Sequence, residues 1–119
     1  MKAIGRHIIL EMWGCQNLDS VETAERALRE MVVALDVNLL DLRVYPFSPV
    51  GVTGIAIVSE SHLVIHTWPE HGFVTIDVYV CNYTTDNTGK AELLFRTMQG
   101  ALMPQHTKFQ AIHRGGRDA

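Results

Sequence analysis

A chain of 119 residues is long enough for one domain with its own hydrophobic core, and we expect a single domain over residues 1–119. Its net charge of −3, with basic residues scattered along the sequence, predicts neither nucleic acid nor a membrane as a partner. The N-terminus has no apolar run adequate for a signal peptide or a membrane span, so we expect a cytoplasmic protein with Cys15 and Cys81 as reduced thiols.

The elements are predicted from hydrophobic periodicity and turn residues. A short strand over 7–12 precedes a capping box at Asp19 and Glu22, and apolar residues at helical spacing then continue to Leu35. Further strands are expected over 39–45, 54–59, 63–67, 73–80 and 108–113, and a second helix over 91–102. This order predicts an α+β two-layer sandwich, an antiparallel sheet with both helices packed on one face. The other face would stay uncovered in a monomer, which favours a homodimer.

The densest group of polar residues lies between residues 59 and 72. His62, His66 and His71 are spaced like the ligands of a metal on a helix, but Pro69 and the β-rich context argue against a helix here. Residues four apart on a strand are about 13 Å from each other, too far to share one ion. We therefore expect no metal site.

A turn at residues 69–72 would fold this segment into a hairpin in which the strand ending at Trp68 pairs with the strand beginning at Phe73. Extending that register places Cys81 opposite Glu60 and diagonal to Ser61. The sequence therefore brings these three residues together at one end of a hairpin.

Strand alternation sets one difficulty for this arrangement. His66 falls beside Thr75 and on the same face as Cys81, whereas Ser61 in an unbroken strand would point to the opposite face. A register error of one residue, a bulge or a break in the chain would each remove the conflict.

Several motifs occur along the chain: Gly5-Arg6-His7, the loop from Phe47 to Gly54, Ser59-Glu60-Ser61-His62-Leu63, Ile65-His66-Thr67-Trp68-Pro69-Glu70, and Cys81. With these motifs the chain resembles the prokaryotic S-adenosylmethionine decarboxylases, the small pyruvoyl enzymes of polyamine synthesis, over about residues 5 to 113. The Glu-Ser-His-Leu and Ile-His-Thr-Trp-Pro-Glu pieces in tandem are highly specific for that family.

The resemblance implies that Ser61 attacks the carbonyl of Glu60 and that the chain cuts itself between these two residues. The products would be a chain of residues 1–60 and a second chain whose first residue, Ser61, has become a pyruvoyl group. This cofactor would form a Schiff base with S-adenosylmethionine and accept electrons as carbon dioxide leaves, to supply aminopropyl groups for spermidine.

The resemblance also implies roles for other residues. Cys81 would return a proton to the substrate, His66 would assist proton removal during self-processing, and Thr53 would support it with a hydroxyl where the family usually has serine. The resemblance implies that Phe47 and Trp68 contact the adenine with their aromatic rings and that the Glu70 carboxylate accepts hydrogen bonds from the ribose hydroxyls. In this family the pocket is shared between protomers, so the resemblance implies a homodimer of processed chains.

Alternatives remain open at this stage. Tyr45-Pro46 stand where the family commonly has His-Arg, which keeps a pyruvoyl decarboxylase of ornithine or arginine in view. A non-catalytic relative that binds a partner without processing is the third possibility, although it would have no chemical need for Glu60, Ser61, His66 and Cys81 together. His62 is ambiguous, and structural roles are expected for Cys15, His71, His106 and His113.

Overall fold

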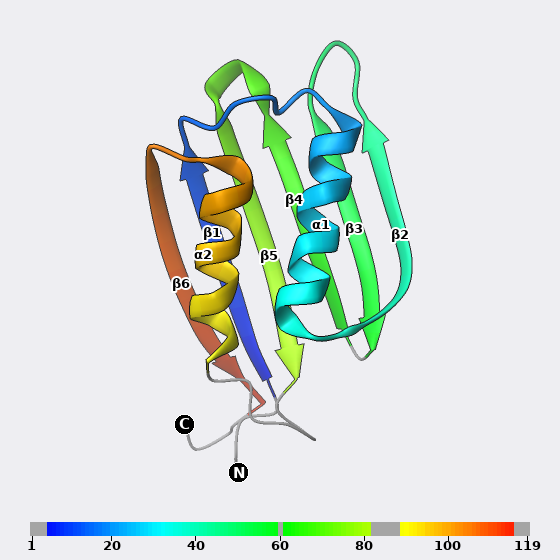
Figure 1. Ribbon diagram of the computed structural model, residues 1–119, viewed down its shortest axis with the longest axis vertical. Helices are drawn as coiled ribbons and strands as arrows, with labels where there is room; N and C mark the ends of the chain where they lie inside the picture. Colours follow the sequence, from blue (N-terminus) through cyan, green and yellow to red (C-terminus); the bar gives the residue numbers. More distant parts are fainter. Residues whose placement is uncertain (1–4, 60, 82–88, 116–119) are drawn as a thin grey trace.

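The computed structural model describes residues 5–59, 61–81 and 89–115 and has the two predicted layers (Figure 1). Two helices lie side by side on one face of a six-stranded antiparallel sheet, which confirms the α+β sandwich. In chain order the elements are β1 (Gly5–Trp13), α1 (Val21–Leu35), β2 (Asn38–Pro46), β3 (Val52–Ser59), β4 (Ser61–Trp68), the short 3-10 helix η1 (Pro69–His71), β5 (Phe73–Cys81), α2 (Lys90–Leu102) and β6 (His106–Arg114).

The strand order in the sheet is β2-β3-β4-β5-β1-β6. Strands β2 to β5 pair in the order of the sequence, whereas β1 lies between β5 and β6 and pairs with both. The first and second halves of the chain are therefore interleaved, because a strand from the first half is held between two strands from the second (Figure 1).

The predicted register of the β4–β5 hairpin is confirmed. Trp68 pairs with Phe73 and His66 with Thr75, and the pairing continues without a shift to His62 and Tyr79. Gly72 closes the turn at φ +59°, a left-handed conformation that suits glycine. Cys81 pairs on its other side with Gly5, while its expected neighbour Glu60 lies outside the described residues.

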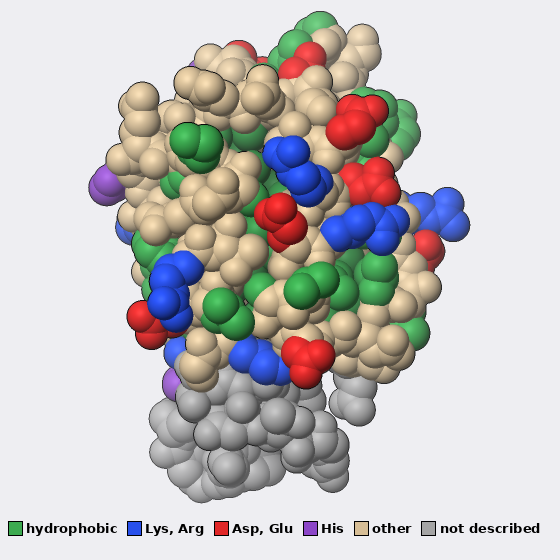
Figure 2. All heavy atoms as spheres, viewed as in Figure 1, with side chains coloured by type: hydrophobic (Ala, Val, Ile, Leu, Met, Phe, Trp, Pro, Cys, Tyr) green, Lys and Arg blue, Asp and Glu red, His purple; other side chains and the backbone are tan. Residues whose placement is uncertain are grey.

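The hydrophobic core lies between the sheet and the helices. In β1, β3, β4 and β5 alternate side chains are buried, as one-sided packing requires. The side chains of α1 that pack against them are Ala24, Ala27, Leu28, Met31 and Leu35, and those of α2 are Ala91, Leu94, Met98 and Leu102. Figure 2 shows that basic and acidic side chains are intermixed on the outward surface of the two helices. We call the sheet face away from the helices the uncovered face.

The prediction of the N-cap of α1 was wrong by one residue. Ser20 is the cap: its Oγ accepts a hydrogen bond from the backbone N–H of Thr23 at 3.1 Å. Asp19 precedes it and instead accepts from the N–H of Gly51, 32 residues further along the chain. Both residue types cap helices well, and the structure gives that role to the one whose side chain reaches the third residue of the helix.

Replacing Ser20 with alanine should therefore lower the free energy of unfolding by about 1 kcal/mol, since it removes the acceptor for an N–H at the start of α1. Ser20→Asp is the matched control, because aspartate restores a capping oxygen. Urea titration of both variants measures the difference. Equal stability of the alanine variant and the parent would contradict this assignment.

Candidate active site

A pocket of about 400 Å³ lies at the end of the sheet where β3 begins and β4 ends. The loop between β2 and β3 forms one wall, and the end of β4 with η1 forms the other. The lining residues are Phe47, Val50, Gly51, Thr53, His66, Thr67, Trp68 and Glu70. The structure thus gathers at one pocket all the residues for which the resemblance implied substrate binding, together with Thr53 and His66.

Thr53 and His66 form the polar pair of the pocket. They are direct partners across strands β3 and β4, so both side chains lie on the uncovered face. The Thr53 Oγ1 and the His66 Nδ1 are 3.0 Å apart, a hydrogen bond that fixes the orientation of the imidazole ring. Since both residues are on paired strands, this geometry belongs to the rigid part of the fold.

Aromatic rings flank this pair. The ring centroids of Trp68 and His66 are 6.1 Å apart, and Trp68 also contacts Phe73 at 5.5 Å. Phe47, on the opposite wall, contacts Tyr45 at 5.2 Å. Phe47 and Trp68 are 50% and 40% exposed, so each keeps a large part of its ring surface available to a ligand.

Ser61 lies at the other end of the same strand. It is the first residue of β4, half-buried, and pairs with Val58 across the β3–β4 connection, so that the predicted cleavage site is at the tip of a hairpin. His66 lies five positions after Ser61 on the strand, which corresponds to about 16 Å. By strand alternation Ser61 shares the helix side with the buried Leu63, opposite to the side of His66.

The difficulty of strand alternation is therefore real in the uncut chain. The described pairs of β4 and β5 contain neither a shift of register nor a bulge, so along this hairpin neither of them removes the conflict between Ser61 and His66. Cys81 is the last residue of β5, at the same end of the sheet as Ser61. Its side chain and the whole of Glu60 lie outside the described part of the structure.

Cys15 and four of the histidines do not line this pocket. Cys15 is buried, and burial raises the pKa of its thiol to about 11, so it remains a neutral thiol at physiological pH. The ring of His106 stacks on Trp13 with centroids 5.3 Å apart. His62 and His113 are exposed on strands and His71 is exposed in η1.

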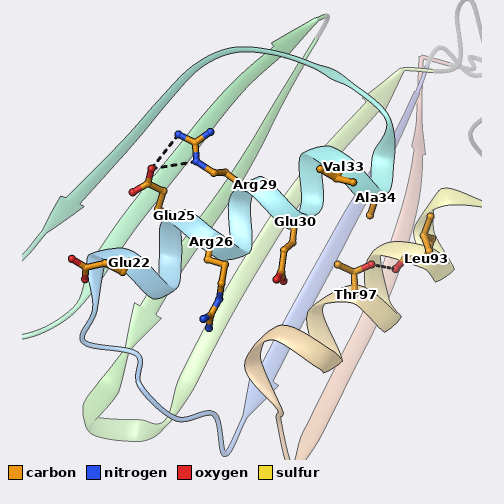
Figure 3. A pocket seen from close by; sticks show the side chains of 9 residues that line it. All are labelled: Glu22, Glu25, Arg26, Arg29, Glu30, Val33, Ala34, Leu93 and Thr97. Atoms are coloured by element: carbon orange, nitrogen blue, oxygen red, sulfur yellow. Dashed lines mark hydrogen bonds and ion pairs between the residues drawn. The ribbon is translucent and has the colours of Figure 1, made fainter.

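A wider hollow of about 710 Å³ lies on the other side of the sheet, between α1 and α2 (Figure 3). Its polar groups are helix-surface side chains, and two of them pair with each other: Arg29 donates to Glu25 at 3.1 Å. Within the described ranges no three His, Cys, Asp or Glu residues gather closely enough to hold a metal ion, and no helix there is long and apolar enough to span a membrane. The pocket at the end of β4 is thus the better candidate site.

Sequence reasoning missed the part that Thr67 and Asp19 have in this pocket. Thr67 is a polar side chain buried on the helix side of β4, only 6% exposed. Asp19 was interpreted as a helix cap. The sequence holds only part of the signal for Asp19: two good capping residues stand next to each other before α1, and only one of them can cap it. This leaves the other free for a different contact and does not indicate its partner.

Comparisons with known proteins identify the family of this chain. A family model described as S-adenosylmethionine decarboxylase matches residues 6–115. The chain belongs to this family. The family uses a pyruvoyl group as its cofactor.

Individual relatives cover nearly the whole chain. An S-adenosylmethionine decarboxylase proenzyme from Thermomicrobium roseum is 45% identical over 97% of both chains. A proenzyme of the same name from Methanococcus maripaludis is 41% identical and covers 97% of this chain and 93% of its own. The crystal structure of the adenosylmethionine decarboxylase from Aquifex aeolicus is 32% identical and superposes with a TM-score of 0.84 over 97% of this chain and 93% of that one.

Proposed function

We propose that this protein decarboxylates S-adenosylmethionine after cutting its own chain between Glu60 and Ser61. The observation that carries the proposal is the pocket in which Thr53 and His66 are hydrogen-bonded between two half-exposed aromatic rings. Relatives over almost the full length are named as proenzymes of this activity, and a solved adenosylmethionine decarboxylase has this fold. The product would supply aminopropyl groups for polyamine synthesis, and we propose the cytoplasm as its location.

The pocket suits the nucleoside end of the substrate. Its volume of about 400 Å³ is typical of a small-molecule site. Phe47 and Trp68 come from opposite walls, and a flat purine can pack against such rings. Glu70, exposed at the start of η1, can accept hydrogen bonds from a ribose diol. Tyr45 contacts Phe47, so the departure from the family motif at residues 45 and 46 acts on the pocket through Phe47.

Ser61 supplies the nucleophile for the cut. Its Oγ attacks the carbonyl carbon of Glu60, the peptide C–N bond breaks, and an ester joins the two residues while the nitrogen of Ser61 takes up a proton. β-Elimination of the ester leaves a carboxylate on Glu60 and a dehydroalanine at residue 61. Water hydrolyses the imine tautomer of this dehydroalanine, so that ammonia leaves and a pyruvoyl group remains in place of Ser61. We propose that His66, oriented by Thr53, moves the proton in this process.

The fold supports a cut at this position. Strand β3 ends at Ser59 and β4 begins at Ser61, and after the cut β3 keeps its pairs with β2 while β4 keeps its pairs with β5. A free end at residue 61 is also no longer held in the alternation that places Ser61 on the helix side of the sheet. The residues therefore fit a pyruvoyl group at this position, where it would supply an electron sink for the loss of carbon dioxide. We propose that Cys81, at the same end of the sheet, returns the proton to the α-carbon.

The distance of about 16 Å between Ser61 and the pocket supports a homodimer. A substrate whose nucleoside end lies at His66 and Trp68 does not reach Ser61 of the same chain. Two chains whose uncovered faces meet with their strands antiparallel would bring the pocket of one to Ser61 of the other. Exposed apolar side chains on this face also support an association there: Tyr45, Ile55, Ile57, Trp68 and Ile112.

Release of labelled carbon dioxide tests the proposed substrate. The purified, processed protein should release it from carboxyl-labelled S-adenosylmethionine and leave carboxyl-labelled ornithine and arginine unchanged, because Phe47, Trp68 and Glu70 suit a nucleoside. The three substrates are assayed in parallel at equal concentration. Release from ornithine or arginine in preference to S-adenosylmethionine would overturn the substrate assignment.

A further inference from the structure

The pocket wall that carries Phe47 is a loop held at its end by two successive backbone amides. The N–H of Phe47 donates to the carbonyl of Gly51 at 2.7 Å, which closes the loop. Gly51 has φ +105°, and a Cβ at this position would lie 3.2 Å from the carbonyl oxygen of Thr67. The loop therefore approaches β4 as closely as a glycine allows, and its position depends on what holds residues 51 and 52.

Two side chains accept these amides. The N–H of Gly51 donates to Asp19 Oδ1 at 3.0 Å, and the N–H of Val52 donates to Thr67 Oγ1 at 2.9 Å. The Thr67 hydroxyl in turn donates to the carbonyl of Leu18 at 2.9 Å. Both amides are thus connected to the segment between β1 and α1. The N–H of Gly51 bonds to Asp19 directly, and the N–H of Val52 is linked to Leu18 through the Thr67 hydroxyl.

The same connection also holds the other wall. The N–H of Cys15 donates to the carbonyl of Gly72 at 3.0 Å, directly after η1, which carries Glu70. Residues 14–20 therefore contact both walls of the pocket from outside it. Of these contacts, only the one made by Asp19 joins a charged side chain to a backbone amide. Such a hydrogen bond is about twice as strong as one between neutral groups.

We infer that Asp19 is a positioning residue for the substrate pocket, whose carboxylate holds the Phe47 loop at the distance from Trp68 that the nucleoside end of the substrate requires. Asp19 does not line the pocket and acts through Gly51. Ser20 takes the helix cap, so the carboxylate of Asp19 is free for this contact. The inference rests on the proposed function only for the identity of the ligand.

Three variants test it in the full, processed protein. Asp19→Ala removes the acceptor and leaves the buried N–H of Gly51 without it, whereas Asp19→Asn keeps an oxygen in the same place. Glu22→Ala is the matched control, because it removes a carboxylate three residues away that does not contact the loop. Hydrogen exchange of the peptide covering residues 47–52 is measured together with KM and kcat for S-adenosylmethionine. The binding of methylthioadenosine is measured as well, because this ligand keeps the adenine, the ribose and the 5′ methylthio group and lacks the amino-acid chain.

Asp19→Ala should speed hydrogen exchange in the 47–52 peptide and raise KM about tenfold, with kcat within twofold of the parent. The affinity for methylthioadenosine should fall to a similar extent. The cleaved fraction should stay the same, because Thr53 and His66 are held by paired strands. Asp19→Asn should recover most of the loss, and Glu22→Ala should match the parent in every measurement. The split between KM and kcat separates positioning from general destabilisation, which would lower both the cleaved fraction and kcat.

Unchanged exchange in Asp19→Ala would overturn the contact itself. Faster exchange with unchanged KM and unchanged methylthioadenosine binding would overturn its role in the pocket. A parent protein that neither decarboxylates S-adenosylmethionine nor binds methylthioadenosine would overturn the proposed function and the role of Asp19 with it. Hydrogen exchange still reports separately on the contact in that case, so the two failures are distinguishable.

Discussion

Replacing Ser61 with alanine is expected to give one uncut chain of 119 residues that releases no carbon dioxide from S-adenosylmethionine. Alanine has no hydroxyl to attack the carbonyl of Glu60, and without the cut no pyruvoyl group forms. Because the cofactor is made from this side chain, the loss of activity should be complete, and mass spectrometry of the denatured protein should show only the full-length species. The parent should show two fragments, of residues 1–60 and 61–119.

Ser59→Ala is the matched control for this experiment. Ser59 ends β3 in the same hairpin and is exposed, so its loss should leave cleavage unchanged. Persistent cleavage between residues 60 and 61 in the Ser61→Ala variant would show that Ser61 is not the nucleophile. Cleavage that disappears in both variants would point to the shape of the hairpin rather than to one hydroxyl.

The two fragments of the parent should stay together under native conditions. Strand β1 of the first fragment lies between β5 and β6 of the second, and β3 of the first pairs with β4 of the second. Separating them would break three strand interfaces and expose the core. This interleaving explains how the chain can be cut near its middle without loss of the fold.

Mixed dimers of two inactive variants are expected to recover decarboxylase activity. Ser61→Ala and His66→Ala should each be inactive alone, since one lacks the nucleophile and the other the group proposed to move its proton. A dimer with one copy of each should regain about half the activity of the parent, because one of its two sites combines the intact Ser61 with the intact His66 of the other chain. The mixed dimer is obtained by co-expression with two different tags and purified on both.

Cleavage gives a second measure that does not depend on the substrate. In the mixed dimer the His66→Ala chain should be cut, because it keeps Ser61 and receives His66 from the other chain. The matched control is a mixed dimer of Ser61→Ala with a chain carrying both substitutions, which has no intact Ser61 and should stay uncut. An inactive, uncut dimer of the two single variants would place Ser61 and His66 in the same chain's site and contradict the shared pocket.

Local patterns in the sequence predicted the elements and the β4–β5 hairpin well. The order of strands and helices agrees with the structure, and the pairing of Trp68 with Phe73 follows from the turn that Pro69 and Gly72 impose. Such local patterns did not predict the contact of Asp19. Its partner Gly51 is 32 residues away, and nothing in the few residues around Asp19 indicates that the chain returns to it.

For the pocket, too, the sequence indicated one part of the arrangement and the structure another. The sequence indicated that Thr53, His66 and Trp68 belong to one site, through motifs whose residues lie on two neighbouring strands. The rise along a strand already places Ser61 about 16 Å from His66. Only the structure shows that the β2–β3 loop closes a pocket around His66, at the end of β4 away from Ser61. That separation is what makes a second chain necessary to the proposed mechanism.

The sequence by itself therefore determined the α+β class and the register of the β4–β5 hairpin, because hydrophobic period and turn chemistry act over a few residues. The resemblance to a family, and not these local patterns, implied the pocket residues Phe47, Thr53, His66, Trp68 and Glu70. Only the tertiary structure decided that β1 lies between β5 and β6 and that Asp19 holds Gly51. Each of these depends on which distant segment packs beside which. That choice is made by burial of the whole core, and no single segment encodes it.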